Sequence, residues 1–315
     1  MRTMQIETVT LSLARPLIRS QDVRNVIDVV RITLEEQGYI GLGECTPYTE
    51  YQESATSVCQ QLEAVRAELE SGLSRDALQS RLPPGAARNA LDCALWRLDA
   101  ALQKKNLWQH LGMLSPASLL TTETLSLDTQ DNMVKAAADA ISRGARVLKL
   151  KLDRHDIVEK VAAIRASAPR VTLMIVANAS WGGLDLHSLS LALRPYHIAL
   201  IEQPLPAGND QELLRFPHPI PLCADESCRH SVDIPTLRRR YEMINIKLDK
   251  CGGLTEALSM VQEARVHGLK LMVGCMLGSS LAMEAALPVA TVADYVDLDG
   301  PLWLAADSSP YLTYH

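Results

Sequence analysis

The sequence predicts an α/β protein, a (β/α)7β barrel with an N-terminal α+β capping domain. After residue 112, eight short apolar runs alternate with amphipathic helical stretches. A polar or unusual residue near the end of each run recurs every 22 to 28 residues, at Thr124, Lys149, Val176, Glu202, Asp225, Lys247, Cys275 and Asp297. One strand and one helix per repeat, taken eight times, is what a closed barrel requires.

The first 112 residues show a different pattern. Residues 5–13 and 26–34 alternate apolar and polar positions, which is typical of antiparallel strands with one buried face. We interpret residues 14–25, which carry three arginines, as a mobile polar loop and residues 38–44 as turn-rich. Residues 57–70 and 87–103 follow a helical period. We therefore expect a capping domain over 1–112, a barrel over 113–301, and a tail over 302–315 that returns to the capping domain.

Composition excludes several functions. The 31 Lys and Arg against 37 Asp and Glu give a net charge of −6, which argues against nucleic acid as a partner. No stretch is long enough for a membrane helix, and the N-terminus lacks an apolar signal core, so we expect a cytoplasmic protein without a membrane partner. Seven scattered cysteines without a CxxC pair predict reduced thiols, not a disulfide framework or a zinc site.

Charged side chains gather at the ends of the predicted barrel strands. Lys149 and Lys151 are two apart on one strand, so both point to the same face. Carboxylates and a further lysine end four other strands: Glu202, Asp225, Glu226, Lys247, Asp249, Asp297 and Asp299. Inward charge in a barrel is costly unless it is paired or binds a metal. The pattern predicts an active site at the carboxyl rim.

Several motifs carry a resemblance to a known family. KLK at 149–151, ANxxW at 177–181, IEQP around Glu202, ADES around Asp225 and NIKLDKCGG around Lys247 resemble the enolase superfamily in its muconate-lactonizing subgroup. GECTPY at 43–48, AARNALDCALW at 86–96 and DLDGP at 297–301 are similar to the L-Ala-D/L-Glu dipeptide epimerases, and the similarity runs from residue 1 to about 303. The resemblance implies a dipeptide epimerase that recycles murein peptides.

The resemblance also implies a mechanism. Lys151 and Lys247 would exchange protons with the α-carbon of a carboxylate, while Lys149 helps to neutralise the enediolate. A lysine base must be partly neutral near pH 7, so we expect its pKa to be lowered. The seventh strand ends in Gly274, Cys275 and Met276 without a histidine, which favours the two-lysine subgroup over the one with a histidine base.

The metal ligands implied by the resemblance are incomplete. Glu202 and Asp225 match the second and third carboxylate ligands of Mg²⁺, but Val176 stands where the first, an aspartate, is expected. Asn178 and Glu226 would lie next to the metal ligands and help to orient them without binding the ion themselves. Valine has no donor atom, so we expect weak Mg²⁺ binding and reduced activity.

For the substrate, the resemblance assigns the acid pair Asp297 and Asp299 to the dipeptide ammonium. Arg24 aligns with an arginine that pairs with the side-chain carboxylate of glutamate. Thr124, Cys275 and Met276 would line the pocket, with plain core packing as the alternative for these three.

Other interpretations stay open. A cycloisomerase or o-succinylbenzoate synthase also uses two barrel lysines, although its substrate carries no ammonium for the DLDGP pair. Because of Val176, the chain is alternatively an impaired or inactive homologue, or a ligand knock-out, that still binds dipeptide or another protein. The sequence does not decide whether it forms a homo-oligomer.

Overall fold

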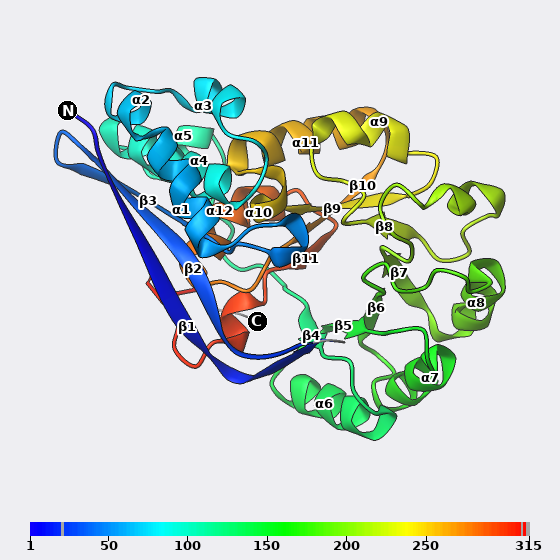
Figure 1. The fold of residues 1–315 in the computed structure, drawn as a ribbon. Helices are drawn as coiled ribbons and strands as arrows, with labels where there is room; N and C mark the ends of the chain where they lie inside the picture. Colours follow the sequence, from blue (N-terminus) through cyan, green and yellow to red (C-terminus); the bar gives the residue numbers. More distant parts are fainter. Residues whose placement is uncertain (20–21, 310, 313–315) are drawn as a thin grey trace.

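The computed structural model describes residues 1–19, 22–309, 311 and 312. Within them, a three-stranded antiparallel sheet with its helices lies beside an eight-stranded parallel sheet that is surrounded by helices (Figure 1). The predicted α/β class, with a (β/α)7β barrel and an α+β capping domain, is confirmed.

The barrel strands run in chain order around the sheet: β4 (Glu123–Leu125), β5 (Val147–Lys151), β6 (Thr172–Val176), β7 (Ile198–Glu202), β8 (Leu222–Ala224), β9 (Met243–Lys247), β10 (Lys270–Gly274) and β11 (Tyr295–Asp297). The first and last strands meet, because the backbone N–H of Thr122 donates to the carbonyl of Val296 at 2.9 Å. The sheet is therefore closed, and the carboxyl ends of all these strands share one rim.

Helices cover the outside of the barrel and bury their apolar sides against the strands. Their bounds are α6 (Gln130–Ser142), α7 (Ile157–Ser167), α8 (Leu186–Leu193), α9 (Ile234–Leu237), α10 (Leu248–Cys251), α11 (Leu254–Val266) and α12 (Ser280–Ala290). Between β7 and β8 the connection contains the 3₁₀ helix η3 (Gln211–Arg215), and another, η5 (Gly300–Trp303), follows β11.

The capping sheet is larger than the sequence pattern predicts. Its strands are β1 (Thr3–Arg19), β2 (Asp22–Glu36) and β3 (Tyr39–Cys45). The expected polar loop over 14–25 is wrong, because the β1–β2 ladder resumes beyond an irregularity, with Leu17 paired to Arg24. Backbone hydrogen bonds extend this hairpin, and they do not require alternating apolar side chains.

The third capping strand contains glycines, which are typical of turns and do not indicate a strand in the sequence. The interpretation of residues 38–44 as turn-rich is wrong beyond Gly38, because the rest of this segment belongs to β3. A Cβ on Gly41 or Gly43 would lie 2.1 or 1.9 Å from the carbonyl oxygens of Ala94 and Ala90. These glycines are therefore packing positions that admit the helix α4 (Ala86–Leu102) against the strand.

The remaining capping helices are α1 (Ala55–Ala64), α2 (Arg66–Glu70), α3 (Arg75–Arg81) and α5 (Leu107–Leu111). Buried polar groups tie α4 to the barrel just after β9. Asn89 Nδ2 donates to Asp249 Oδ1 at 2.7 Å, and Arg88 Nη2 donates to the carbonyl of Cys251 at 2.7 Å. These contacts fix the capping domain beside the strand that carries Lys247.

The chain after the barrel runs along the capping sheet. Leu304 forms an isolated antiparallel bridge with Leu13, and the N–H of Ala305 donates to the carbonyl of Ser12 at 2.8 Å. In the described residues, no helix combines the length and apolar character that a membrane span needs. All seven cysteines are free thiols.

Candidate active site

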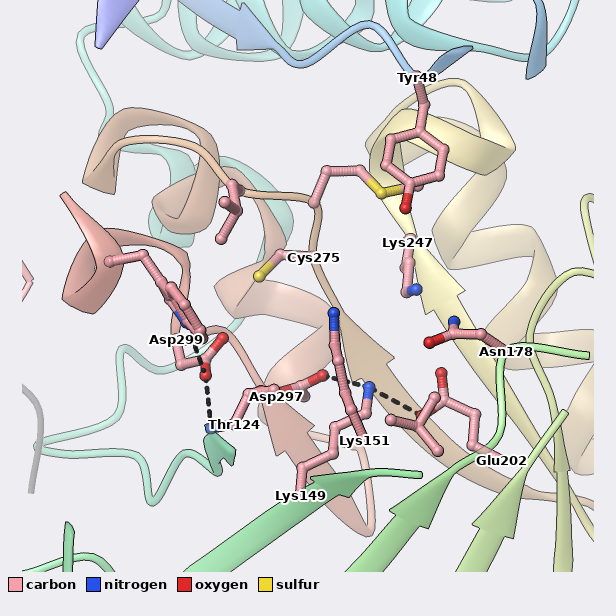
Figure 2. Close-up of a pocket in the computed structure, with 14 residues that line it drawn as sticks. Tyr48, Thr124, Lys149, Lys151, Asn178, Glu202, Lys247, Cys275, Asp297 and Asp299 are labelled. Carbon is pink, nitrogen blue, oxygen red and sulfur yellow. Dashed lines mark hydrogen bonds and ion pairs between the residues drawn. The ribbon is translucent and has the colours of Figure 1, made fainter. Parts of the chain in front are cut away.

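A polar pocket lies at the carboxyl rim of the barrel. Side chains from the ends of the barrel strands and from two loops line it (Figure 2): Tyr48, Thr124, Lys149, Lys151, Val176, Asn178, Glu202, Lys247, Cys275, Met276, Leu277, Asp297, Asp299 and Trp303. The structure therefore brings most of the predicted site residues together at the predicted rim.

Two lysines reach this pocket from different strands. Lys151 is the last residue of β5 and Lys247 the last of β9, and Figure 2 shows both side chains directed into the same hollow. Lys149 has the same inward orientation as Lys151 because side chains two apart on a strand share a face. The strand ends thus present three ammonium groups to one space.

Lys149 is held between two carboxylates. Its Nζ lies 2.8 Å from Glu202 Oε2 on β7 and 2.7 Å from Asp297 Oδ2 on β11. The contact with Glu202 is an ion pair whose geometry is unsuitable for a hydrogen bond. The contact with Asp297 is both an ion pair and a hydrogen bond. Burial lowers the pKa of Lys149, but the two carboxylates outweigh burial and raise the pKa above its ordinary value. Lys149 is therefore a fixed positive charge.

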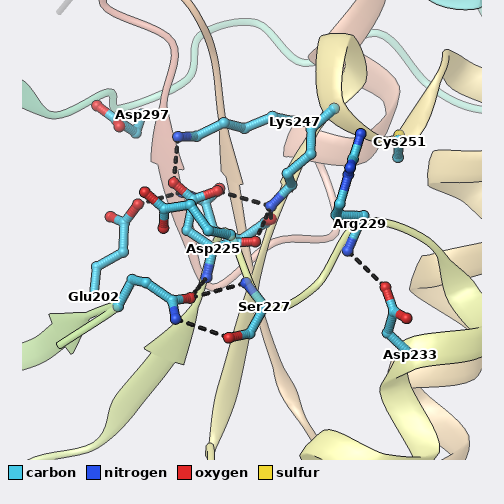
Figure 3. Close-up of polar contacts among 12 residues, drawn as sticks. Glu202, Asp225, Ser227, Arg229, Asp233, Lys247, Cys251 and Asp297 are labelled. Carbon is cyan, nitrogen blue, oxygen red and sulfur yellow. Dashed lines mark hydrogen bonds and ion pairs between the residues drawn. The ribbon is translucent and has the colours of Figure 1, made fainter. Parts of the chain in front are cut away.

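Lys247 is paired with Asp225, which directly follows the neighbouring strand β8. Its Nζ lies 2.5 Å from Asp225 Oδ2 (Figure 3). The fully buried Lys250 places its Nζ 2.7 Å from Asp225 Oδ1. Burial lowers the pKa of Lys247, yet Asp225 and Glu202 raise it well above the ordinary value. The expectation of a lowered lysine pKa is wrong for Lys247 in this state, because the ion pair stabilises its charged form.

The side chain of Gln203 holds the backbone around Asp225 in place. The N–H of Asp225 donates to Gln203 Oε1 at 2.9 Å, and Gln203 also accepts the N–H of Ser227 at 3.1 Å. Burial raises the pKa of Asp225, but Lys247 and Lys250 lower it far below the ordinary range. Asp225 is thus an ionised carboxylate whose position is set before any ligand arrives.

Asp297 is the last residue of β11 and Asp299 follows two residues later, and the two aspartates differ in their surroundings. Asp297 accepts hydrogen bonds from Lys149 and from the Thr122 hydroxyl, and its pKa is lowered because Lys149 outweighs the effect of burial. Asp299 accepts the N–H of Thr124 at 2.8 Å. Burial and the nearby Asp297 raise its pKa to about 6. Both side chains belong to the pocket wall.

Family models match both halves of this architecture. Residues 1–112 match the mandelate racemase/muconate lactonizing enzyme N-terminal domain, and residues 132–301 match the enolase C-terminal domain-like model. The chain belongs to the mandelate racemase/muconate lactonizing enzyme group of the enolase superfamily. The resemblance carried by the sequence motifs is confirmed at this level.

Curated relatives in this superfamily have more than one activity. The chain is 46% identical to the L-Ala-D/L-Glu epimerase of Escherichia coli strain K12, over 100% of this chain and 98% of the relative. It is 41% identical to an N-acetyl-D-glutamate racemase of Pseudoalteromonas sp, over 91% of this chain and 90% of that protein. Both alignments span most of each protein.

Solved structures of superfamily members agree with the fold. An enolase family member from Agrobacterium tumefaciens, solved with bound sodium and L-Ala-L-Glu, has a TM-score of 0.94 and 43% identity, covering 100% of this chain and 96% of that one. A dipeptide epimerase from Methylococcus capsulatus, solved with Mg and L-Arg-D-Lys, has a TM-score of 0.89 and 30% identity, covering 97% and 92%.

The donors present in this superfamily member do not fit a complete Mg²⁺ site. Glu202 Oε1 accepts Asn245 Nδ2 at 3.0 Å, and Lys149 pairs with its Oε2, while both oxygens of Asp225 contact ammonium groups. Val176 contributes only carbon atoms. Among the described residues, no three His, Cys, Asp or Glu side chains gather so as to hold a metal. Mg²⁺ requires near-octahedral oxygen coordination, so two paired carboxylates are a poor set.

Asn178 and Glu226 lie together beside this pair of carboxylates. Asn178 Nδ2 donates to Glu226 Oε1 at 3.4 Å, and Glu226 Oε2 is buried with no hydrogen-bond partner in the described chain. Burial, then the charge of Asp225, raise the pKa of Glu226 to about 7. Asn178 has a positive φ of 44°, a conformation that asparagine tolerates better than most residues.

Arg24 belongs to the capping hairpin of this superfamily member. It lies in β2, where its backbone pairs with Leu17, and it is not among the described residues that line the pocket. Sequence reasoning missed Tyr48, Leu277 and Trp303 as lining residues. Tyr48 belongs to the GECTPY motif and Trp303 lies two residues after DLDGP, so nearby motifs could have indicated both residues. No motif points to Leu277.

Proposed function

We propose that the chain is a dipeptide epimerase of the L-Ala-D/L-Glu type, which inverts the α-carbon of the glutamate residue by two-lysine proton transfer. The observation that carries this proposal is the convergence of Lys151 and Lys247 on one pocket that also contains the acid pair Asp297 and Asp299. The 46% identity to an epimerase of this type over the whole chain supports it.

The two lysines divide the proton transfer between them. One takes the α-proton from one face of the carbon, and the other delivers a proton to the opposite face, which inverts the centre. The ion pair with Asp225 keeps Lys247 charged, so in the state described Lys247 holds the proton to be delivered. Turnover in the opposite direction requires Lys247 to leave Asp225 and become neutral.

Charge that develops on the substrate carboxylate must be stabilised in the pocket. The Lys149 ammonium is fixed by Glu202 and Asp297, so it costs little reorganisation when the enediolate forms. We propose that Lys149 provides this stabilisation in the chain as it stands. No step is assigned to a metal, because the donors do not make a complete site.

We further propose that Mg²⁺ binds weakly and that activity is reduced relative to enzymes with three carboxylate ligands. Glu202 and Asp225 are the residues that would hold the ion, and Val176 removes the third anionic ligand. A bound divalent ion supplies Lewis acidity toward a substrate carboxylate. An inactive homologue that only binds dipeptide is the limiting case of this proposal.

Each charged group of the dipeptide is assigned to pocket or capping residues of opposite charge. The acid pair at the end of β11 would accept the dipeptide ammonium. Arg24 would recognise the glutamate side chain, by its alignment with the arginine of the Ala-Glu epimerases. An N-acylated glutamate, the substrate class named for one relative, has no ammonium to satisfy these carboxylates, and neither has a cycloisomerase substrate.

A substrate comparison tests the function. The chain is incubated with L-Ala-L-Glu, L-Ala-L-Met and N-acetyl-L-Glu, and the glutamate or methionine epimers are separated by chiral chromatography. We expect D-epimer from L-Ala-L-Glu first. Faster racemisation of N-acetyl-L-Glu than of the dipeptide would replace the proposal with an N-acylamino acid racemase, and binding of L-Ala-L-Glu without any inversion would leave the binding-only homologue.

A further inference from the structure

Part of the pocket wall is the loop over 275–279 that joins β10 to α12, called here the β10–α12 loop. It follows the last residue of β10, and it ends at Ser279, the N-cap of α12. Since β10 lies between β9 and β11, the loop stands between Lys247 at the end of β9 and the acid pair that begins at the end of β11. Apolar side chains of the loop line the pocket, namely Cys275, Met276 and Leu277.

The capping domain holds the middle of the β10–α12 loop. Thr46 directly follows the last residue of β3 and is 7% exposed. Its hydroxyl donates to the carbonyl of Leu277 at 2.6 Å, and its N–H donates to Asp249 Oδ1 at 3.1 Å. Tyr48, two residues further on, enters the pocket from the capping domain (Figure 2). One short capping segment thus lines the pocket and also holds a barrel loop that forms part of its wall.

The end of the loop is held by a buried carboxylate on the same capping strand. Glu44 is 1% exposed, and its Oε1 accepts the N–H of Ser279 at 2.7 Å. Its Oε2 accepts the Ser279 hydroxyl at 2.8 Å and Arg31 Nε at 2.8 Å. Arg31 and Glu44 are register partners on β2 and β3, so the guanidinium fixes the carboxylate from within the capping sheet. The position of Ser279, and with it the start of α12, therefore depends on the capping sheet.

The backbone of the loop also packs closely against the DLDGP segment. A Cβ on Gly300 would lie 3.2 Å from the backbone N and O atoms of Gly278 and from the carbonyl oxygen of Met276. Glycine permits this close approach, which leaves the loop little room to move toward Gly300. The loop therefore lies between the DLDGP segment and β3, and its hydrogen bonds to the capping domain oppose movement away from the capping strand.

We propose that Thr46 and Glu44 are positioning residues that hold the β10–α12 loop, and that through this loop the capping domain limits the size of the N-terminal residue of the dipeptide. This inference deepens the proposed function and rests on it. A dipeptide with its reacting carbon at Lys247 and its ammonium at the acid pair passes the loop with its peptide bond and N-terminal residue. The apolar side chains of the loop then face the alanine methyl group, and a bulkier side chain meets them.

Thr46→Val and Thr46→Ser test the hydroxyl in the full chain. Valine has nearly the shape of threonine but leaves the carbonyl of Leu277 without this donor, whereas serine keeps the hydroxyl. The probes are L-Ala-L-Glu and L-Leu-L-Glu, and chiral chromatography gives kcat/KM for each. We expect Thr46→Val to reduce the preference for L-Ala-L-Glu by about threefold or more, because a loosened loop admits the larger side chain, and Thr46→Ser to keep that preference.

The ratio of the two kcat/KM values separates positioning from general damage. A variant that is only less stable contains less folded enzyme, which lowers both values by the same factor. Thr10→Val is the matched control, because the Thr10 hydroxyl donates to Asp28 at 2.6 Å on an exposed part of the capping sheet. It should keep the parental ratio. Circular dichroism measures the folding of each variant.

Hydrogen–deuterium exchange tests the loop without any substrate. Peptides that cover 275–281 should exchange faster in Thr46→Val than in the parent or in Thr10→Val, because fewer hydrogen bonds hold the loop. Glu44→Gln is a second variant. In either orientation of the amide, its amino group replaces an oxygen that accepts from Ser279. It should speed exchange in the same peptides and reduce the same preference.

Two outcomes would overturn the inference. Unchanged exchange over 275–281 in both Thr46→Val and Glu44→Gln would show that these residues do not hold the loop. Faster exchange with an unchanged preference would show that the loop does not limit the N-terminal residue. If the parent binds both dipeptides without turnover, the ratio of their calorimetric Kd values replaces the kinetic ratio and decides in the same way. A parent that binds neither dipeptide contradicts the proposed function, whereas the exchange measurement still decides the positioning role.

Discussion

Val176 and Glu202 are register partners on adjacent parallel strands of the barrel. Both are the last residues of their strands, and both line the pocket. A hydrocarbon side chain therefore stands beside the carboxylate with which an aspartate would share a metal ion. This placement follows from the strand register, and it is the reason for our expectation of weak metal binding.

Restoring a carboxylate at this position should restore the metal site. We expect Mg²⁺ to bind the parent in the millimolar range or more weakly, which corresponds to no more than about −4 kcal/mol. Val176→Asp should tighten Mg²⁺ binding at least about tenfold and raise epimerase activity together, because the metal acts mainly on the transition state. Calorimetric titration measures binding. Val176→Asn is the matched control, since it adds a polar group without charge and should change little; tight binding by the parent would contradict the account.

The lysine pair should be essential in both directions of epimerisation. Lys151→Ala and Lys247→Ala should each reduce epimerisation by roughly 10² to 10⁴, the usual contribution of a general acid or base. The exposed Lys270 at the start of β10 provides the control, and Lys270→Ala should keep parental activity. Chiral chromatography from each epimer measures the rates. Near-parental inversion in either pocket variant would refute the two-base assignment.

Arg24 should discriminate between dipeptides by their side chains. Arg24→Ala should raise KM for L-Ala-L-Glu far more than for L-Ala-L-Met, by roughly ten to a hundredfold for a charge-assisted contact worth about 1.5–3 kcal/mol. Arg15, whose guanidinium lies 4.1 Å from the ring centroid of the pocket residue Trp303, is the comparison. If Arg15→Ala shows the glutamate-specific loss and Arg24→Ala does not, the specificity assignment moves to Arg15.

Stability should depend on pH through Asp249, at the junction of the capping domain and the barrel. Burial raises its pKa from 3.8 to about 7 in the folded protein. The folded state thus holds this proton more tightly than the unfolded chain, so the free energy of unfolding should fall as pH rises from about 4 to about 7. The full shift corresponds to about 4 kcal/mol.

Asp249→Asn isolates this effect. The N–H of Thr46 and the Nδ2 of Asn89 both donate to Oδ1, which asparagine retains. Urea unfolding at pH 5 and pH 8 should show that the variant gains stability over the parent as pH rises, by about 1–4 kcal/mol at pH 8. A stability difference that is the same at both pH values would show that Asp249 does not titrate in this range.

The sequence was sufficient for the barrel because its strand ends carry distinctive residues at a regular spacing. The charges of Lys149, Glu202 and Lys247 at that spacing predict a shared rim, and the structure brings these residues to one pocket. The hairpin extension at Leu17 and Arg24 was missed, because a backbone ladder leaves no apolar alternation to read. The strand β3 was missed because its glycines resemble turn residues.

The sequence pattern does not predict which charged side chains on neighbouring strands form ion pairs. That Lys247 contacts Asp225, and so has a raised pKa, depends on the two side chains meeting across β8 and β9. The same holds for Lys250, which lies three residues after Lys247 and closes the other side of Asp225. Spacing indicates which residues share a rim, but not which of them form pairs.

We expect this pocket to remove and return the α-proton of a dipeptide. Incubation of the unmodified chain with L-Ala-L-Glu in D₂O, with and without Mg²⁺, measures this directly by ¹H NMR and mass spectrometry of the glutamate residue. We expect one deuterium at the glutamate α-carbon together with L-Ala-D-Glu, formed slowly by the parent and faster by Val176→Asp. No exchange and no inversion in either protein, at dipeptide concentrations that saturate binding, would contradict it.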